Sequence, residues 1–267
     1  MKIAAAQISC AVGEIETNLR KIREFAECAK RQAVDWIVFP EMSDTGYVMS
    51  VIRERASRWN DGAVPQLRAL AREFSLGILC GVSERTDDCI FNSQAVIDST
   101  GVLIGKYRKA HLFAPAPIEE HKCFAAGGEA VTVPIDRFRF GLTICYDLRF
   151  PEIYRTLAVD QDADVFVISS AWPFPRVEHL RTLATARAIE NQSYVILANR
   201  VGTDDGVTFC GSSAIIDPYG VVVAAASSDR EELVVADLSE ETLRTVRDHM
   251  PVMRHRRPEV YQRTKPA

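Results

Sequence analysis

The sequence predicts an α/β fold in which a mixed β-sheet is covered by helices. Short, nearly continuous apolar segments typical of buried strands alternate along the chain with segments whose apolar residues recur every three or four positions. No linker rich in proline, glycine or serine, no internal repeat and no low-complexity run interrupts this alternation. We therefore expect a single domain over residues 1–267, with an extended tail from about residue 251.

The chain is expected to begin with a strand, a helix and a second strand. Residues 2–8, KIAAAQI, are mostly apolar and lack the alternation of a half-exposed strand, so they predict a buried strand. A helix is expected from about 14 to 32, because apolar residues there recur at helical spacing: Ile15, Leu19, Ile22, Phe25, Ala26 and Ala29. Segment 35–41, DWIVFPE, predicts a strand that ends at Pro40, since proline cannot continue a central ladder. Glu41 then lies at the carboxyl end of this strand.

The remaining elements continue the alternation to the end of the chain. Further strands are expected at 77–82, 91–97, 102–107, 131–135, 138–144, 164–170, 194–199, 213–216, 221–225 and 233–236. Further helices are expected at 65–74, 151–159, 179–191 and 239–249. The turn sequence at 98–101 predicts a hairpin, and Ser239 is a suitable N-cap for the last helix.

The composition is typical of a soluble globular protein and excludes several classes of partner. Hydrophobic residues make up 47% of the chain, charged residues 25%, and the net charge is -4, so we expect no nucleic-acid partner. No apolar stretch approaches the length of a membrane span, and Gln7 and Ser9 interrupt the first apolar run before it resembles a secretory signal. The seven cysteines include no C-x-x-C pair and no zinc-type spacing. We expect reduced thiols, a cytoplasmic location, and neither a metal nor a cofactor.

Three residues that could carry chemistry follow predicted strands. Segment 142–150, LTICYDLRF, stops its apolar run on Cys145, and a cysteine nucleophile needs such exposure together with a base and an oxyanion donor. Glu41 also lies at the end of a predicted strand, and Lys109 in GKYRKAHLF could supply a fixed positive charge. Taken singly, each has an ordinary alternative: a core cysteine, a surface carboxylate and a solvated lysine.

The order of three segments resembles the nitrilase superfamily of carbon-nitrogen hydrolases. FPEMSDTGY, GKYRKAHLF and TICYDLRFPE occur in the order of the family's motifs, whose Glu-Lys-Cys triad falls here on Glu41, Lys109 and Cys145. SSAWP, ARAIENQSYVILANRVG and GSSAIIDPYG extend the resemblance through the second half of the chain. It implies a four-layer α-β-β-α sandwich of the nitrilase type that forms a homodimer or larger homo-oligomer.

A second glutamate follows from the same resemblance. EEHKCFAAGG is similar to the family segment in which a glutamate precedes an aromatic residue and a glycine, which selects Glu120 before Phe124 and Gly127. Glu120 would orient Lys109 or the substrate. The neighbouring Glu119 is the alternative, and a plain surface carboxylate is the simpler explanation of either residue.

The activity implied by the resemblance is hydrolysis of a non-peptide carbon-nitrogen bond. A small amide would give a carboxylic acid and ammonia through a thioester on Cys145. CYDLRFPE looks more like the amidase branches, including omega-amidases, than like the carbamoylase pattern with two arginines before a tryptophan. An N-carbamoyl amino acid hydrolase, a true nitrilase and a non-enzymatic binding protein on the same fold remain alternatives. A papain-like pair of Cys145 with His111 or His179 is another.

Four residues near predicted strand ends are candidates for substrate binding. Tyr47, Tyr146 and Trp172 could line a pocket, although each could equally pack in the core. Arg149 could meet a substrate carboxylate, or it could form a structural ion pair with Asp147 or Glu152.

Overall fold

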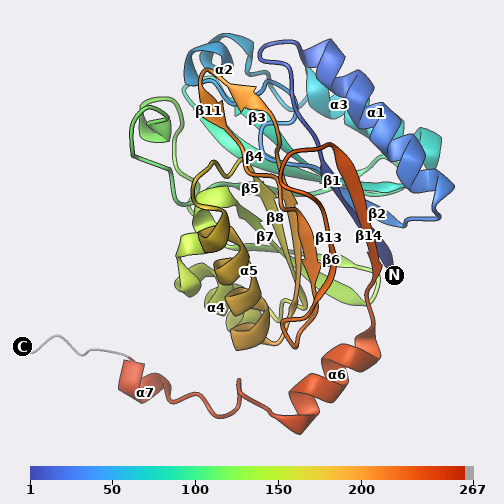
Figure 1. Cartoon of the computed structure of the whole chain (residues 1–267), viewed down its shortest axis with the longest axis vertical. Helices are drawn as coiled ribbons and strands as arrows, with labels where there is room; N and C mark the ends of the chain where they lie inside the picture. The colour runs from blue at the N-terminus through green and yellow to red at the C-terminus, as the bar shows by residue number, and fades with distance from the viewer. Residues whose placement is uncertain (262–267) are drawn as a thin grey trace, which may run out of the picture.

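The computed structural model describes residues 1–261 and contains two six-stranded sheets, with helices on the outer face of each (Figure 1). This arrangement confirms the four-layer α-β-β-α sandwich that the resemblance implied. The alternation of strands and helices predicted mixed sheet structure covered by helices, but it did not predict how many sheets the strands form. The order of strands and helices along a chain does not specify which strands pair, and here the strands divide into two mixed sheets.

The first sheet has the order β14-β1-β2-β3-β4-β5. Its strands are β1 (Lys2–Gln7), β2 (Trp36–Val38), β3 (Gly77–Arg85), β4 (Ile90–Ile97), β5 (Leu103–Arg108) and β14 (Glu232–Asp237). β1, β2 and β3 run parallel, whereas β4, β5 and β14 pair antiparallel with their neighbours. The predicted hairpin between β4 and β5 is confirmed.

The second sheet has the order β13-β12-β9-β8-β7-β6. Its strands are β6 (Val131–Ile135), β7 (Phe138–Ile144), β8 (Val165–Ser170), β9 (Tyr194–Asn199), β12 (Ala214–Ile216) and β13 (Val222–Ala225). β7, β8 and β9 form its parallel centre. A separate short ribbon of β10 (Thr203–Asp204) and β11 (Val207–Thr208) was not predicted, since two-residue strands leave no periodicity in the sequence.

Helices cover the outer faces, and apolar side chains fill the space between the sheets. α1 (Ile15–Arg31) and α3 (Ala63–Phe74) pack on the first sheet, and α4 (Pro151–Asp160) and α5 (Val177–Asn191) pack on the second (Figure 1). Successive strand residues point to opposite faces, so Ile37 meets the α1/α3 layer while Val38 points towards the second sheet.

Two helices outside the four covering ones test the predictions, and one of them was missed. α2 (Met49–Arg55) was not expected, because seven residues are too few to show a periodic face. The cap of α6 (Glu240–His249) is confirmed, since Ser239 Oγ accepts a hydrogen bond from the Thr242 N–H at 3.3 Å.

The tail predicted to be extended from about residue 251 contains a turn followed by the short helix α7 (Pro258–Tyr261). Pro258 occupies the first position of that helix, where its missing N–H carries no penalty. The rest of the tail, 262–267, lies outside the described residues. Over residues 1–261, none of the helices has the length and apolar composition needed to cross a membrane.

Candidate active site

The sandwich brings together three strand ends from its two sheets. Glu41 follows β2 and Lys109 follows β5 in the first sheet, whereas Cys145 follows β7 in the second. All three side chains are nearly inaccessible to water, with exposed fractions of 0% for Glu41, 1% for Lys109 and 6% for Cys145. Buried charges of this kind require close partners, because an isolated ion in a protein interior is costly.

Lys109 lies between the two predicted glutamates. Its Nζ donates to Glu41 Oε1 at 2.8 Å and to the Glu120 carboxylate at 2.8 and 2.9 Å. Glu120 stands in the 3₁₀ turn η1 (Glu120–Lys122), fully buried, so the choice of Glu120 over the partly exposed Glu119 agrees with the geometry. One lysine therefore joins two carboxylates in a single buried cluster.

Several hydrogen bonds that were not predicted complete this cluster. Asn92 Nδ2 donates to Glu41 Oε1 at 2.6 Å and to Glu120 Oε1 at 2.9 Å. The Tyr47 hydroxyl and the Phe113 N–H each donate to Glu120 at 2.7 Å, and the Ala171 N–H donates to Glu41 at 2.8 Å. Asn92 had only a weak signal in the sequence, because it is one of three successive polar residues in the strand IFNSQAVI, and the backbone donors left no signal at all.

The surroundings of the cluster raise the pKa of both Glu41 and Lys109, but for different reasons. Burial raises the pKa of Glu41, Lys109 opposes that shift, Glu120 adds to it, and the hydrogen bond from Asn92 again lowers it. Burial acts to lower the pKa of Lys109, but the charges of Glu120 and Glu41 outweigh it and raise that pKa above its usual value. Lys109 is thus a permanent cation beside a carboxylate that takes up a proton more readily than an exposed glutamate does.

Cys145 occupies a strained backbone position at the start of the 3₁₀ turn η2 (Cys145–Arg149). Its φ of 44° lies in the left-handed region, which residues other than glycine rarely adopt. Asp147 stabilises the turn, because its buried carboxylate accepts the Ile144 N–H at 2.9 Å and the Tyr107 hydroxyl at 2.8 Å. The sequence indicated the strand end but not the strain.

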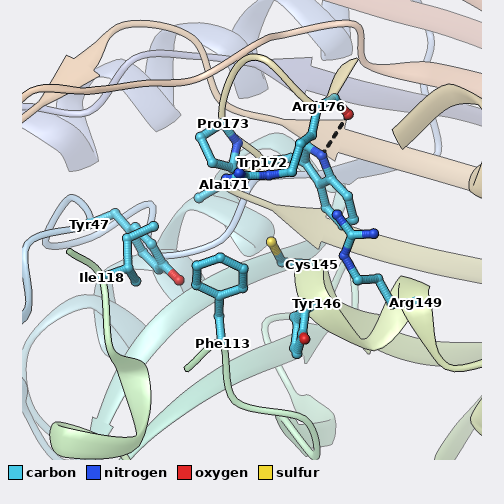
Figure 2. A pocket seen from close by; sticks show the side chains of 10 residues that line it. All are labelled: Tyr47, Phe113, Ile118, Cys145, Tyr146, Arg149, Ala171, Trp172, Pro173 and Arg176. Carbon is cyan, nitrogen blue, oxygen red and sulfur yellow. Dashed lines mark hydrogen bonds between the residues drawn. The ribbon is translucent and has the colours of Figure 1, made fainter. Parts of the chain in front are cut away.

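The thiol of Cys145 points into a small pocket of about 290 Å³ (Figure 2). Burial raises the pKa of Cys145 well above its usual value, and the negative charge of Glu41 raises it further, although Lys109 opposes both effects. The sulfur is therefore a neutral thiol at neutral pH, so it requires a base to become a nucleophile.

All four predicted substrate-binding residues line this pocket together with Cys145. The lining consists of Tyr47, Phe113, Ile118, Cys145, Tyr146, Arg149, Ala171, Trp172, Pro173 and Arg176. The structural ion pairs considered for Arg149 are absent from residues 1–261: its guanidinium lies over the Trp172 ring, 4.7 Å from the centroid, and beside His179. Arg176 was not predicted, although it lies only three positions after the end of the matching segment SSAWP.

Neither histidine considered as an alternative base lines the pocket. His111 Nδ1 lies 2.8 Å from Asp147 Oδ1, and its ring stacks on Phe150. His179 Nδ1 lies 3.3 Å from the Arg149 guanidinium. In residues 1–261 no group of three or more His, Cys, Asp or Glu side chains is arranged to hold a metal ion. The geometry thus favours Glu41 as the partner of Cys145.

Comparison with known proteins identifies the family. The family model described as "Carbon-nitrogen hydrolase" matches residues 2–248. The chain belongs to that family. Its resemblance to the nitrilase superfamily is thereby confirmed, and the match covers the motifs around Glu41, Lys109 and Cys145.

Curated relatives of this carbon-nitrogen hydrolase include amidases. It is 34% identical to the 2-oxoglutaramate amidase of Bacillus subtilis (strain 168), a match that covers 97% of this chain and 98% of the relative. It is 35% identical to the omega-amidase YafV of Escherichia coli (strain K12), over 81% of this chain and 82% of the relative.

Solved structures with the same fold include members with modified active sites. XC1258 from Xanthomonas campestris, a CN-hydrolase superfamily protein with an arsenic adduct in its active site, matches with a TM-score of 0.90 and 29% identity, covering 96% of this chain and 97% of that one. A mutant of the amidase from Nesterenkonia sp. AN1, with the acetamide moiety of fluoroacetamide added covalently at the active site cysteine, matches with a TM-score of 0.87 and 25% identity. This match covers 98% of this chain and 95% of that one.

Proposed function

We propose that this carbon-nitrogen hydrolase is an amidase, and that it converts a small amide to a carboxylic acid and ammonia through a thioester on Cys145. The observation that carries the proposal is the buried cluster of Glu41, Lys109 and Glu120 next to a thiol that points into a small pocket. That cluster offers a base and a fixed positive charge to a nucleophile that is protonated at rest.

The first half of the reaction forms the thioester. Glu41 takes the thiol proton of Cys145 as the sulfur bonds to the amide carbon, and the carbonyl electron pair moves to the oxygen. Lys109 and the Tyr146 N–H stabilise that oxyanion. Glu41 then gives its proton to the nitrogen, the carbon-nitrogen bond breaks, the oxyanion re-forms the carbonyl, and ammonia leaves.

The second half regenerates the enzyme by hydrolysis. Water attacks the thioester carbon while Glu41 takes a proton from it, which again produces an oxyanion beside Lys109. Collapse of this intermediate breaks the carbon-sulfur bond, the thiolate of Cys145 recovers a proton from Glu41, and the carboxylic acid leaves. Glu120 acts as a positioning residue, because its contacts with Lys109 and Tyr47 hold the cation in place.

The lining of the pocket and the relatives both narrow the substrate class. The side chains around the Cys145 thiol are mainly aromatic or aliphatic, which suits the hydrocarbon part of a small aliphatic amide. The relatives named 2-oxoglutaramate amidase and omega-amidase support an omega-amidase, which hydrolyses the terminal amide of a dicarboxylic acid monoamide. Tyr47, Tyr146 and Trp172 would contact the aliphatic part of such a substrate, and Arg149 its carboxylate.

Ammonia release from a panel of substrates tests the proposal. The panel contains omega-monoamides of dicarboxylic acids, simple aliphatic amides, N-carbamoyl amino acids and nitriles. We expect release from an amide class, lowered by roughly 10³-fold or more in Cys145→Ala and unchanged in the matched control Cys28→Ala, which alters a partly exposed cysteine of α1 outside the pocket.

Other outcomes would assign a different function. Release from nitriles or N-carbamoyl amino acids alone would indicate a nitrilase or a carbamoylase. No release from any substrate would favour a binding protein on the same fold.

A further inference from the structure

Two guanidinium groups line a pocket whose other lining side chains are mainly aromatic or aliphatic. Arg149 and Arg176 are both half-buried and both lie beside Trp172 (Figure 2). Among residues 1–261, neither arginine forms an ion pair with a carboxylate. Half-buried arginines in protein sites usually meet a carboxylate or phosphate, to which they bind through paired hydrogen bonds.

Arg176 is held in place by its backbone, which leaves its side chain available. Its carbonyl oxygen accepts the Trp172 Nε1–H at 2.9 Å and the Leu180 N–H at 3.2 Å, at the start of α5. Its guanidinium makes an aromatic contact, 5.8 Å from the centroid of the Phe113 ring. The backbone of Arg176 is thus fixed at the pocket, while the N–H groups of its guanidinium have no hydrogen-bond acceptor among the described residues.

The charges around the pocket are therefore unevenly distributed. Beside Cys145, the carboxylates of Glu41 and Glu120 share the single cation Lys109, so an additional carboxylate there would be repelled. Beside Trp172, two cations lack a counter-charge. A substrate that carries both an amide and a carboxylate fits this pocket in one orientation only, with the amide at the thiol.

We propose that Arg176 is a specificity-determining residue that, together with Arg149, binds a carboxylate at the end of the substrate opposite the reacting amide. This inference rests on the proposed amidase function and deepens it. It assigns a recognition role to a residue outside the matching motifs, and it requires the enzyme to prefer an anionic monoamide over a neutral amide of the same length.

Two substrates of equal chain length measure this preference. Glutaramate carries the carboxylate, and pentanamide replaces it with a methyl group. We expect the wild-type enzyme to favour glutaramate in kcat/KM, and Arg176→Gln to lower the ratio between the two substrates by roughly 10- to 100-fold, mainly through KM. Arg176→Lys should retain part of the preference, since lysine keeps the positive charge but lacks the planar guanidinium that forms paired hydrogen bonds.

Arg244→Gln on the exposed face of α6 is the matched control and should keep the wild-type ratio.

A binding measurement separates this inference from the proposed function. Titration calorimetry of glutaramate and pentanamide into the Cys145→Ala protein, with and without Arg176→Gln, reports recognition without turnover. A glutaramate preference that depends on Arg176 would support the inference even if no amide were hydrolysed. A wild-type enzyme without any preference, or an Arg176→Gln enzyme that keeps it in both turnover and binding, would overturn the inference.

Discussion

At the scale of single residues, the candidate site depends on charges that water does not reach. Lys109 is buried between Glu41 and Glu120, the charges of Lys109 and Glu120 both act on the pKa of Glu41, and the two carboxylates together raise the pKa of Lys109. Strongly perturbed, mutually dependent groups beside a pocket are typical of catalytic sites. The proposed base strength of Glu41 is therefore a property of its neighbours, and Asn92 is the neighbour that can be altered without removing a charge.

Replacing Asn92 by alanine should shift the acidic limb of the pH–rate profile to higher pH. The Asn92 amide donates to the charged form of Glu41, which lowers the pKa of that carboxyl. Loss of this donor raises the pKa, so more alkaline conditions are needed to ionise the base. The measurement is kcat/KM against pH for Asn92→Ala and wild type, because this parameter reports the free enzyme.

Asn191→Ala provides the control for this profile. Asn191 is also a buried asparagine, but it donates within α5 to the Arg187 carbonyl rather than to the cluster. The acidic limb of the Asn191→Ala pH–rate profile should lie at the same pH as that of the wild type. An Asn92→Ala profile that stays in place or moves to lower pH would contradict the assignment of Glu41 as the base.

The sequence indicated the proposed catalytic residues more clearly than the groups that contact them. Glu41, Lys109 and Cys145 each follow a strand and each lie within a recognisable motif, so position and residue type both indicated them. Arg176 and the N–H groups of Phe113 and Ala171 join the site only through the path of loops, which no local periodicity encodes.

At the scale of elements, the close approach of β3 to the segment after β2 fixes where Glu41 lies. Gly81 in β3 donates its N–H to the Pro40 carbonyl and accepts the Ser43 N–H. A β-carbon at Gly81 would stand 2.4 Å from Pro40 O and 2.6 Å from Glu41 Cα. Both contacts are with backbone, so the chain around Glu41 would have to move.

Gly81→Ala should lower both stability and activity. Forcing a methyl group into this contact should cost about 1–3 kcal/mol of unfolding free energy. A displacement of Glu41 by about 1 Å should lower kcat/KM by roughly 10²-fold. Thermal or denaturant unfolding and steady-state kinetics measure the two effects on the same preparation.

Gly128→Ala is the matched control, because a β-carbon there would meet no atom within 4 Å. Its unfolding free energy should stay within about 0.5 kcal/mol of wild type. Full activity in Gly81→Ala would show that the position of Glu41 does not depend on this contact.

Prediction of the elements was limited by their length. Helices α1 and α3 and the strands of four or more residues left clear periodic or apolar patterns, whereas α2, β10 and β11 did not. Strand pairing across the two sheets depends on contacts distant in sequence, which the order of elements along the chain does not reveal.

At the scale of the whole molecule, the candidate site exists only when both sheets are in place. The first sheet supplies Glu41 and Lys109, and the second supplies Cys145 and the Ala171 N–H that binds Glu41. Further hydrogen bonds join the sheets, from Gln94 to Ser169 and from Ser169 to the Phe39 carbonyl. Residues 1–267 as one domain, a homodimer or larger assembly, and a cytoplasmic location stay predictions.

The most direct test of the central claim is to look for the acyl group on Cys145. Turnover of glutaramate is quenched with acid within the first catalytic cycles, and the tryptic peptide 140–149, FGLTICYDLR, is analysed by mass spectrometry. The account predicts that this peptide gains the mass of the substrate acyl group in the wild-type protein, and that Cys145→Ala shows neither the adduct nor ammonia release. Undiminished ammonia release by Cys145→Ala, with peptide 140–149 unmodified in the wild type, would contradict it.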